Sequence, residues 1–211
     1  MKLKVCGMNH NTQEVAKLQP DYLGFIFWEP SKRSFTTKMP IIDPSIKKVG
    51  VFVDASLEEV IEKVKLYNLD AVQLHGKETP VYCNSLRQKH VEHDNFEIIK
   101  VFSIKDDFDF SIIEPYEEVC DYYLFDTKGK LPGGNGYTFN WSVLKNYPST
   151  KPYFLSGGIG LENVTDIESF QQLEESKYCH AIDINSKFET EPGLKNIEKL
   201  TKFKNKLTSP L

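Results

Sequence analysis

The sequence lacks the features that would assign it to a membrane or to a nucleic-acid surface. No stretch approaches the roughly 18 to 20 apolar residues that a membrane-spanning helix needs. The 26 Lys and Arg residues against 30 Asp and Glu give a net charge of -4 with both signs interspersed, so the basic excess of a nucleic-acid-binding face is absent. An apolar run begins within two residues of Met1, so we expect no signal peptide.

Cysteine is scarce and scattered. Cys6, Cys83, Cys120 and Cys179 have no CxxC spacing, which argues against a disulfide framework and against a zinc knuckle. We therefore expect a cytoplasmic protein whose cysteines are reduced. Three of the four are interpreted as small buried residues. Cys6 ends an apolar run beside a glycine, so it could be either a core residue or a reactive thiol.

No proline- or glycine-rich linker divides the chain, so we expect a single domain over residues 1–211. Short apolar runs alternate with helical patterns along its whole length. Such runs, rich in β-branched and aromatic residues, predict strands. The eight runs begin at Leu3, Asp21, Lys48, Asp70, Glu97, Asp121, Pro152 and His180.

Helix signals separate several of these strands. Ser56 and Glu59 form the capping-box pattern that starts a helix. A last helix is expected to start at Pro192-Gly193, with one apolar stripe. Three prolines after Phe27 leave little room for a helix there. The stripe of the last helix consists of Leu194, Ile197, Leu200 and Phe203.

Eight strand–helix units predict an α/β fold, the (β/α)8 TIM barrel, and 211 residues is near the lower size limit of that fold. The alternative is an open doubly wound sheet. That fold calls for a glycine-rich dinucleotide loop after the first strand, and "CGMNHNT" lacks the pattern. We therefore favour the closed barrel.

The alternation of side chains along each strand predicts polar groups inside the barrel. If Leu3 and Val5 face the helices, Lys4 and Cys6 face inward. Polar side chains in an interior normally filled by apolar residues require partners or a ligand. Other strand-end groups, including Asp54 and Ser103, complete a ring at the mouth. The inward polar set is Lys4, Cys6, Gln73, His75, Asp126 and Asp183.

Two glycine-containing stretches follow later strands. Gly157 and Gly158 end the seventh strand, and Asn185 and Ser186 end the eighth, where barrels of this class usually bind phosphate. The alternative is that the glycines only form a tight turn. After Asp126, "DTKGKLPGGNG" has the composition of a loop that wraps a ligand.

Several stretches, taken in order, resemble one enzyme family. The resemblance, to phosphoribosylanthranilate isomerase of tryptophan biosynthesis, covers essentially the whole chain. It implies a cofactor-free Amadori rearrangement of N-(5-phosphoribosyl)anthranilate to 1-(o-carboxyphenylamino)-1-deoxyribulose 5-phosphate. The stretches are "KVCG", "GFIFWEPSKRS", "VGVFV", "VQLHG", "DTKGKLPGGNGYTFNW", "LSGGIGLENV" and "IDINSKFETEPGLKN".

The resemblance also implies a role for each candidate residue. Asp126 is expected to be the general acid and Cys6 the general base. Arg33 is expected to pair with the anthranilate carboxylate, for which a guanidinium fork is suited. The pocket positions would be Gln73, His75 and Asp183, and the phosphate positions Gly157, Gly158, Asn185 and Ser186.

These roles need a protonated carboxyl and an ionised thiol, the reverse of the reference pKa order. We expect the cation of Lys4 to lie beside Cys6 and to lower the pKa of its thiol. Gly7 is expected to leave room for the substrate. The chain departs from the family pattern at Lys32, Asn135 and Asn140, where proline, threonine and aspartate are usual.

Two other functions remain open on the sequence. Another phosphosugar barrel enzyme, such as an epimerase, would need metal-binding histidines, but only His75 and His180 lie near strands. A non-catalytic phosphometabolite-binding barrel would not need both Cys6 and Asp126. The expected partner is a small phosphosugar, with no metal, nucleic acid or membrane. A monomer is expected, because no outward helix face has a wide apolar stripe, and a dimer is the alternative.

Overall fold

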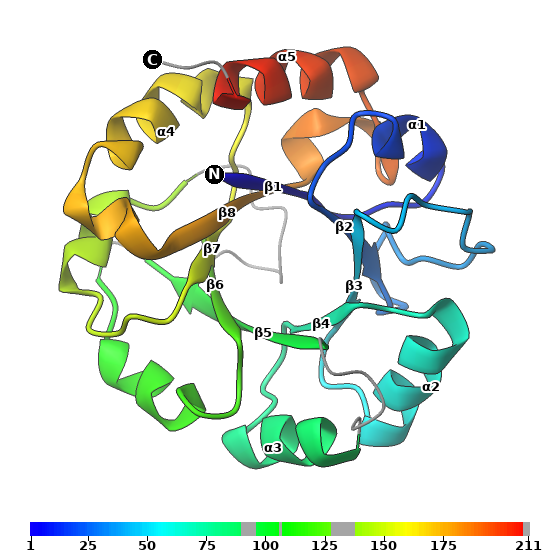
Figure 1. Cartoon of the computed structure of the whole chain (residues 1–211), viewed down its shortest axis with the longest axis horizontal. Helices are drawn as coiled ribbons and strands as arrows, with labels where there is room; N and C mark the ends of the chain where they lie inside the picture. Colours follow the sequence, from blue (N-terminus) through cyan, green and yellow to red (C-terminus); the bar gives the residue numbers. More distant parts are fainter. Residues whose placement is uncertain (90–95, 106, 128–137, 209–211) are drawn as a thin grey trace.

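The computed structural model describes residues 1–89, 96–105, 107–127 and 138–208. Eight parallel strands close into a barrel in which each strand pairs with the next along the chain and β8 pairs with β1. The predicted TIM barrel is therefore confirmed (Figure 1). The strands are β1 (Lys2–Val5), β2 (Tyr22–Ile26), β3 (Lys47–Phe52), β4 (Ala71–Leu74), β5 (Glu97–Ile104), β6 (Tyr122–Thr127), β7 (Tyr153–Leu155) and β8 (Cys179–Ile184).

Helices form a ring around the strands, as Figure 1 shows. After β5 and β6 this outer layer is made by 3₁₀ helices, and η1 contains Pro115, which cannot donate the backbone hydrogen bond of a regular helix. No helix in the described ranges is both long enough and apolar enough to cross a bilayer. The helices are α1 (Thr12–Ala16), α2 (Leu57–Tyr67), α3 (Pro80–Lys89), η1 (Phe110–Tyr116), η2 (Trp141–Asn146), η3 (Leu161–Asn163), α4 (Val164–Gln171), η4 (Glu174–Tyr178), η5 (Ser186–Phe188) and α5 (Ile197–Thr208).

The predicted alternation of side chains is confirmed by two separate cores. Leu3, Val5 and Ile182 belong to the large core between the barrel and the helices. The second core fills the inside of the barrel with apolar side chains, as is usual in this fold. Its buried members are Tyr22, Val49, Ala71, Ile99, Val101, Leu124, Phe154 and Ala181.

The start of α2 is as expected, but the start of the last helix is not. The Ser56 hydroxyl accepts a bond from the Glu59 backbone N–H at 3.1 Å. The predicted start at Pro192-Gly193 is wrong, because a short antiparallel hairpin, β9 (Glu189–Glu191) and β10 (Leu194–Lys195), occupies this stretch. Gly193, with φ +84°, makes the hairpin turn. Leu194 therefore lies outside the helix that begins at Ile197.

His180 lies at the amino-terminal end of the barrel, away from the mouth. Its Nε2 is 2.9 Å from the Tyr22 hydroxyl, and its ring packs against Tyr122 and Phe154. Burial, followed by the charges of Lys2 and Lys47, lowers the pKa of His180 to about 4. The imidazole is consequently neutral in the folded protein at physiological pH.

This burial makes stability sensitive to mild acid. An unfolded histidine has a pKa of about 6.5, so between pH ~6.5 and ~4 the unfolded chain binds more protons than the folded one. The stability from neutral His180 is complete above that range and is lost as the pH falls through it. We expect urea unfolding to show that the advantage of wild type over His180→Gln shrinks from about pH 7 to about pH 4.5. An unchanged difference would contradict this expectation.

Candidate active site

A pocket opens at the carboxyl ends of the strands, where a TIM barrel places its reactive groups. Its walls combine apolar side chains with every residue to which the resemblance assigns a catalytic, substrate-binding or phosphate-binding role. Asp54 and Ser103, which the sequence also placed in the ring, are not among the lining residues. The residues that line it are Cys6, Ile26, Trp28, Ser31, Arg33, Val51, Val53, Gln73, His75, Asp126, Ser156, Gly157, Gly158, Ile159, Asp183, Asn185 and Ser186.

Cys6 follows β1 directly and points into the barrel, where it is 5% exposed. Its backbone N–H donates to the Ile184 carbonyl at 2.8 Å, which fixes the residue against β8. Space for its sulfur comes from Gly24 on β2, where a Cβ would lie 2.8 Å from Sγ. The sequence analysis did not identify Gly24, because the contact joins residues of two neighbouring strands.

Lys4 has a different principal partner from the one expected. Its ammonium donates to Asp183 Oδ2 at 2.8 Å, and both side chains are buried. Burial alone would lower the pKa of Lys4, but the charges of Asp183 and Cys6 outweigh it and the pKa is raised. Lys4 therefore remains a cation inside the barrel.

The pKa of the Cys6 thiol is raised, contrary to the sequence prediction. Burial is the largest influence and raises it; the cation of Lys4 lowers it, Asp183 raises it, and Lys195 lowers it. Lys4 thus lowers the pKa of Cys6, as expected, but its effect is smaller than that of burial. At neutral pH Cys6 is therefore mainly in its thiol form.

Asp126 lies on β6 and is 4% exposed. His75, just beyond β4, places its Nε2 3.5 Å from Asp126 Oδ2, and its Nδ1 is 3.4 Å from the Gln73 amide nitrogen. The structure thus brings Gln73, His75 and Asp126 together as predicted. In barrel order β7 and β8 separate Asp126 from Cys6, so the two residues enter the pocket from different sides.

Three buried polar atoms at the pocket have no hydrogen-bond partner within the described part of the chain. They are Gln73 Oε1, His75 Nε2 and Asp183 Oδ1. His75 Nε2 is near the Asp126 carboxylate, but the geometry does not form a hydrogen bond. Buried groups without partners cost free energy, so their clustering indicates that a polar ligand completes the site.

Arg33 lines the pocket but is held by a carboxylate of the protein itself. Its Nε donates to both Glu189 oxygens at 3.0 and 2.8 Å, and its Nη2 lies 2.7 Å from Oε2. Lys195 donates to Glu189 at 2.7 Å and to the Asn185 side-chain oxygen at 2.7 Å. Burial alone would raise the pKa of Glu189, but Arg33 and Lys195 outweigh it and hold the pKa below its ordinary value.

Glu189 and Lys195 were not singled out from the sequence. Lys195 lies in the stretch that was expected to start the last helix, and Glu189 lies just before that stretch. Their bonds to Arg33 and Asn185, two residues that line the pocket, were therefore not foreseen. Gly7 also has a different function from the one expected. With φ +74°, it leaves the space that Arg33 and Asn185 fill, since a Cβ would lie 2.9 Å from Arg33 Cδ and 2.6 Å from Asn185 Oδ1.

The expected phosphate residues lie together at one side of the pocket. Gly157 and Gly158 have φ angles of +97° and +67°, a conformation that favours glycine. A Cβ on Gly157 would lie 2.1 Å from Thr127 Oγ1. Tight packing against β6 is therefore one reason for this glycine. Asn185 and Ser186 reach the same pocket from the end of β8.

No group of three His, Cys, Asp or Glu side chains able to hold a metal ion occurs among residues 1–89, 96–105, 107–127 and 138–208. The Cys, His and carboxylate side chains of the pocket therefore do not form a metal-ligand set. The glycine-rich stretch after Asp126, with the departure at Asn135, lies in 128–137, outside the described residues. Asn140 caps η2 through a bond from the Ser142 N–H at 3.1 Å, as the aspartate usual there could do.

The fold and the pocket are those of a TIM-barrel enzyme with its reactive groups at the strand ends. Comparison with known proteins is more specific, because residues 3–206 match the model of the N-(5'phosphoribosyl)anthranilate (PRA) isomerase family. The chain belongs to this family. It is 42% identical to the N-(5'-phosphoribosyl)anthranilate isomerase of Parabacteroides distasonis, over 100% of this chain and 95% of that protein.

Solved structures of the same family are similar to this chain in sequence and in fold. The crystal structure of the phosphoribosyl anthranilate isomerase from Thermotoga maritima is 27% identical, with a TM-score of 0.79 over 98% of each chain. A phosphoribosyl anthranilate isomerase in complex with reduced 1-(o-carboxyphenylamino)-1-deoxyribulose 5-phosphate is 25% identical, with a TM-score of 0.75 over 96% of each chain.

Proposed function

We propose that the protein isomerises N-(5-phosphoribosyl)anthranilate to 1-(o-carboxyphenylamino)-1-deoxyribulose 5-phosphate. The observation that carries the proposal is the pairing of Cys6 and Asp126 across one pocket, in a chain of this family. The relative bound to a reduced form of the product supports the same substrate class. An epimerase of the metal-dependent type is not supported, because the described pocket has no metal-ligand set.

Asp126 is proposed as the general acid. In its protonated form the carboxyl donates its proton to the ribose ring oxygen as the bond from that oxygen to C1′ breaks, which leaves an open-chain Schiff base. His75 Nε2 lies 3.5 Å from the carboxylate, and Gln73 lies beside His75. These neighbouring side chains leave the carboxyl less room to rotate, which favours one orientation of the acid.

Cys6 is proposed as the general base. The Schiff base acidifies the proton on C2′, the thiolate removes that proton, and the resulting enolamine tautomerises to the ketone. Lys4 and Lys195 both stabilise the thiolate electrostatically, although burial opposes its formation. The entry of Cys6 and Asp126 from different sides allows them to act on different atoms of one bound substrate.

The remaining candidates are proposed to bind the substrate. Arg33 would meet the anthranilate carboxylate, with Glu189 fixing the guanidinium fork from its other side. The unpartnered oxygens of Gln73 and Asp183 are suited to ribose hydroxyl groups, because each can accept a hydrogen bond. The phosphate is assigned to Gly157, Gly158, Asn185 and Ser186.

The test is direct. Purified protein is mixed with freshly made phosphoribosylanthranilate, and loss of substrate fluorescence is followed together with the appearance of the rearranged product. We expect turnover without an added metal or cofactor. The absence of turnover by wild-type protein would overturn the proposal, and tight binding without turnover would favour the non-catalytic phosphometabolite-binding alternative.

We also propose that the protein is a cytoplasmic monomer forming one domain over residues 1–211. The large apolar side chains exposed in the described ranges are spread over separate elements, including Ile41, Leu66, Val81 and Leu173, and do not gather on one helix. The cysteines in the described ranges are free thiols, which suits a reducing compartment. Sedimentation equilibrium checks the oligomeric state.

A further inference from the structure

A charged pair is buried outside the barrel interior, beside the pocket but not within it. Lys100 on β5 and Glu78 in the connection from β4 to α3 lie 2.8 Å apart, with side chains 3% and 2% exposed. Lys100 pairs with Leu74 across the strands and, like Leu74, faces the helix layer. Neither residue lines the substrate pocket.

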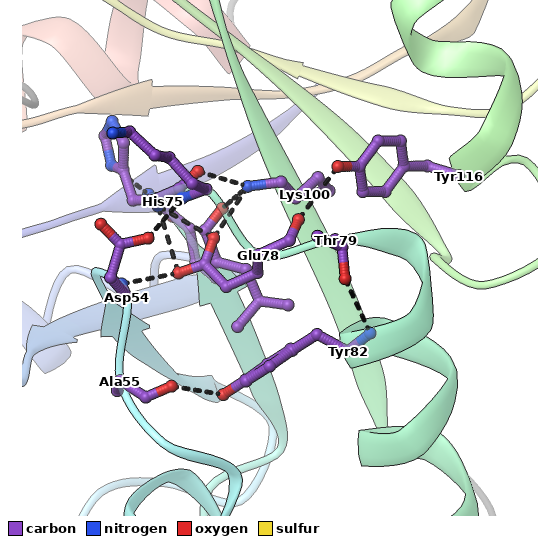
Figure 2. Close-up of polar contacts among 12 residues, drawn as sticks. Asp54, Ala55, His75, Glu78, Thr79, Tyr82, Lys100 and Tyr116 are labelled. Carbon is purple, nitrogen blue, oxygen red and sulfur yellow. Dashed lines mark hydrogen bonds and ion pairs between the residues drawn. The ribbon is translucent and has the colours of Figure 1, made fainter.

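The pair binds the backbone on both sides of His75. Lys100 Nζ donates to the Leu74 carbonyl at 3.2 Å and to the Gly76 carbonyl at 2.8 Å. The two Glu78 oxygens accept from the Gly76 N–H at 3.2 and 3.0 Å. Figure 2 shows these bonds converging on the turn next to His75.

Residues at the end of β3 and in η1 also bond to the turn next to His75. Glu78 Oε1 accepts from the Asp54 N–H at 2.9 Å, which ties the turn to the end of β3. The Tyr116 hydroxyl donates to the Glu78 carbonyl at 3.0 Å (Figure 2). A Cβ on Gly76 would lie 2.4 Å from Asp54 Oδ1, so the turn closes tightly against Asp54. The backbone at 74–78 is thereby fixed to β3, β5 and η1.

Stability alone is a weak reason for this arrangement. Apolar side chains of similar size at buried ion pairs often give equal or greater stability. An apolar pair could fill the space between the barrel and α3, but it could not bond the two carbonyls that flank His75. The ion pair therefore supplies orientation in addition to packing.

We propose that Lys100 and Glu78 are positioning residues that fix the His75 ring opposite Asp126. They act through the backbone of 74–76 and touch no substrate. The inference rests on the proposed function, since His75 lies 3.5 Å from the carboxylate to which the acid role is assigned. Loss of the pair would let the ring, and with it the acid, leave the reactive geometry.

The test replaces both charges together, so that no unpaired charge is left buried. We expect Lys100→Met with Glu78→Leu to remain folded and to lose ~10- to 100-fold in kcat, with KM changed less than about threefold, because an error of about 1 Å in a catalytic group can cost that much. The matched control, Lys47→Met with Glu97→Leu, removes an ion pair at the opposite end of β3 and β5 and should retain kcat.

Two further measurements test whether Lys100 and Glu78 act through His75. In a His75→Ala background the Lys100/Glu78 replacement should change kcat by less than about twofold, because the positioned group is already gone. A full additional loss there would overturn the proposal, as would unchanged kcat in the first experiment. A crystal structure of the double variant should show the His75 Nε2 to Asp126 Oδ2 separation increased. That readout needs no turnover, so it separates failure of this inference from failure of the proposed function.

Discussion

Asp126→Asn lowers kcat for phosphoribosylanthranilate by at least ~100-fold, the usual size of a general acid–base contribution. Asparagine has nearly the shape of aspartate and still lines the pocket, but it has no proton to give to the ribose ring oxygen. We expect KM to change little, since the substrate contacts assigned to Arg33 and to the phosphate residues remain. The measurement is steady-state loss of substrate fluorescence, with unfolding followed in parallel.

Asp121→Asn is the matched control for this variant. Asp121 precedes the same strand at its other end, where it pairs with Arg87 at 2.8 Å and accepts from the Ile98 N–H at 2.7 Å. The control should lose some stability and keep its turnover number. If Asp126→Asn retained more than a tenth of wild-type kcat, Asp126 would not be the acid.

Cys6→Ser is expected to reduce kcat by at least ~100-fold as well, because a serine hydroxyl does not ionise at the pH of the assay. Serine is close to cysteine in volume, so the contacts with Gly24 are retained. Cys179→Ser, at the start of β8 and far from the mouth, should turn over like wild type. Turnover by Cys6→Ser near the wild-type rate would assign the base to another group.

The raised pKa of Cys6 also predicts the form of the pH profile. The reactive form, with Asp126 protonated and Cys6 ionised, holds as many protons as the form with the reverse assignment. The share of the reactive form therefore falls when the pH rises through the pKa of Cys6 and this proton is lost. Because burial raises that pKa, we expect kcat/KM to stay flat through neutral pH and to fall only above about pH 8.5, the ordinary thiol value. A fall that begins well below it would contradict this assignment.

Much of the site could be predicted because strand geometry is periodic. Alternation alone placed Lys4, Cys6 and Asp183 inside the barrel, and the strand ends placed Gln73, His75 and Asp126 at the mouth. The glycines after β7 were visible as a local pattern. Each of these predictions needs only neighbouring residues and the knowledge that eight strands close a barrel.

The missed residues depend on pairings across the fold. Gly24 matters because of a sulfur on the neighbouring strand, and Glu189 because of a guanidinium 156 residues away in sequence. Lys100 faces the helix layer from the middle of β5, and a lysine is ordinarily expected to be solvated and not buried in a salt bridge. Likewise, the pKa of Cys6 depends on burial as well as on the charge of Lys4. The extent of burial depends on the whole fold and cannot be predicted from neighbouring residues in the sequence.

The bond between Lys4 and Asp183 has a consequence for folding during synthesis. The two residues are 179 positions apart, on the first and the last strand of the barrel, which pair with each other. Until β8 has left the ribosome, Asp183, the carboxylate that pairs with the Lys4 ammonium, is not available, and burying the ammonium without this partner would cost free energy. We therefore expect the β1 edge to stay unpaired until the last strand docks, and the cavity that holds Cys6 to form only at that step.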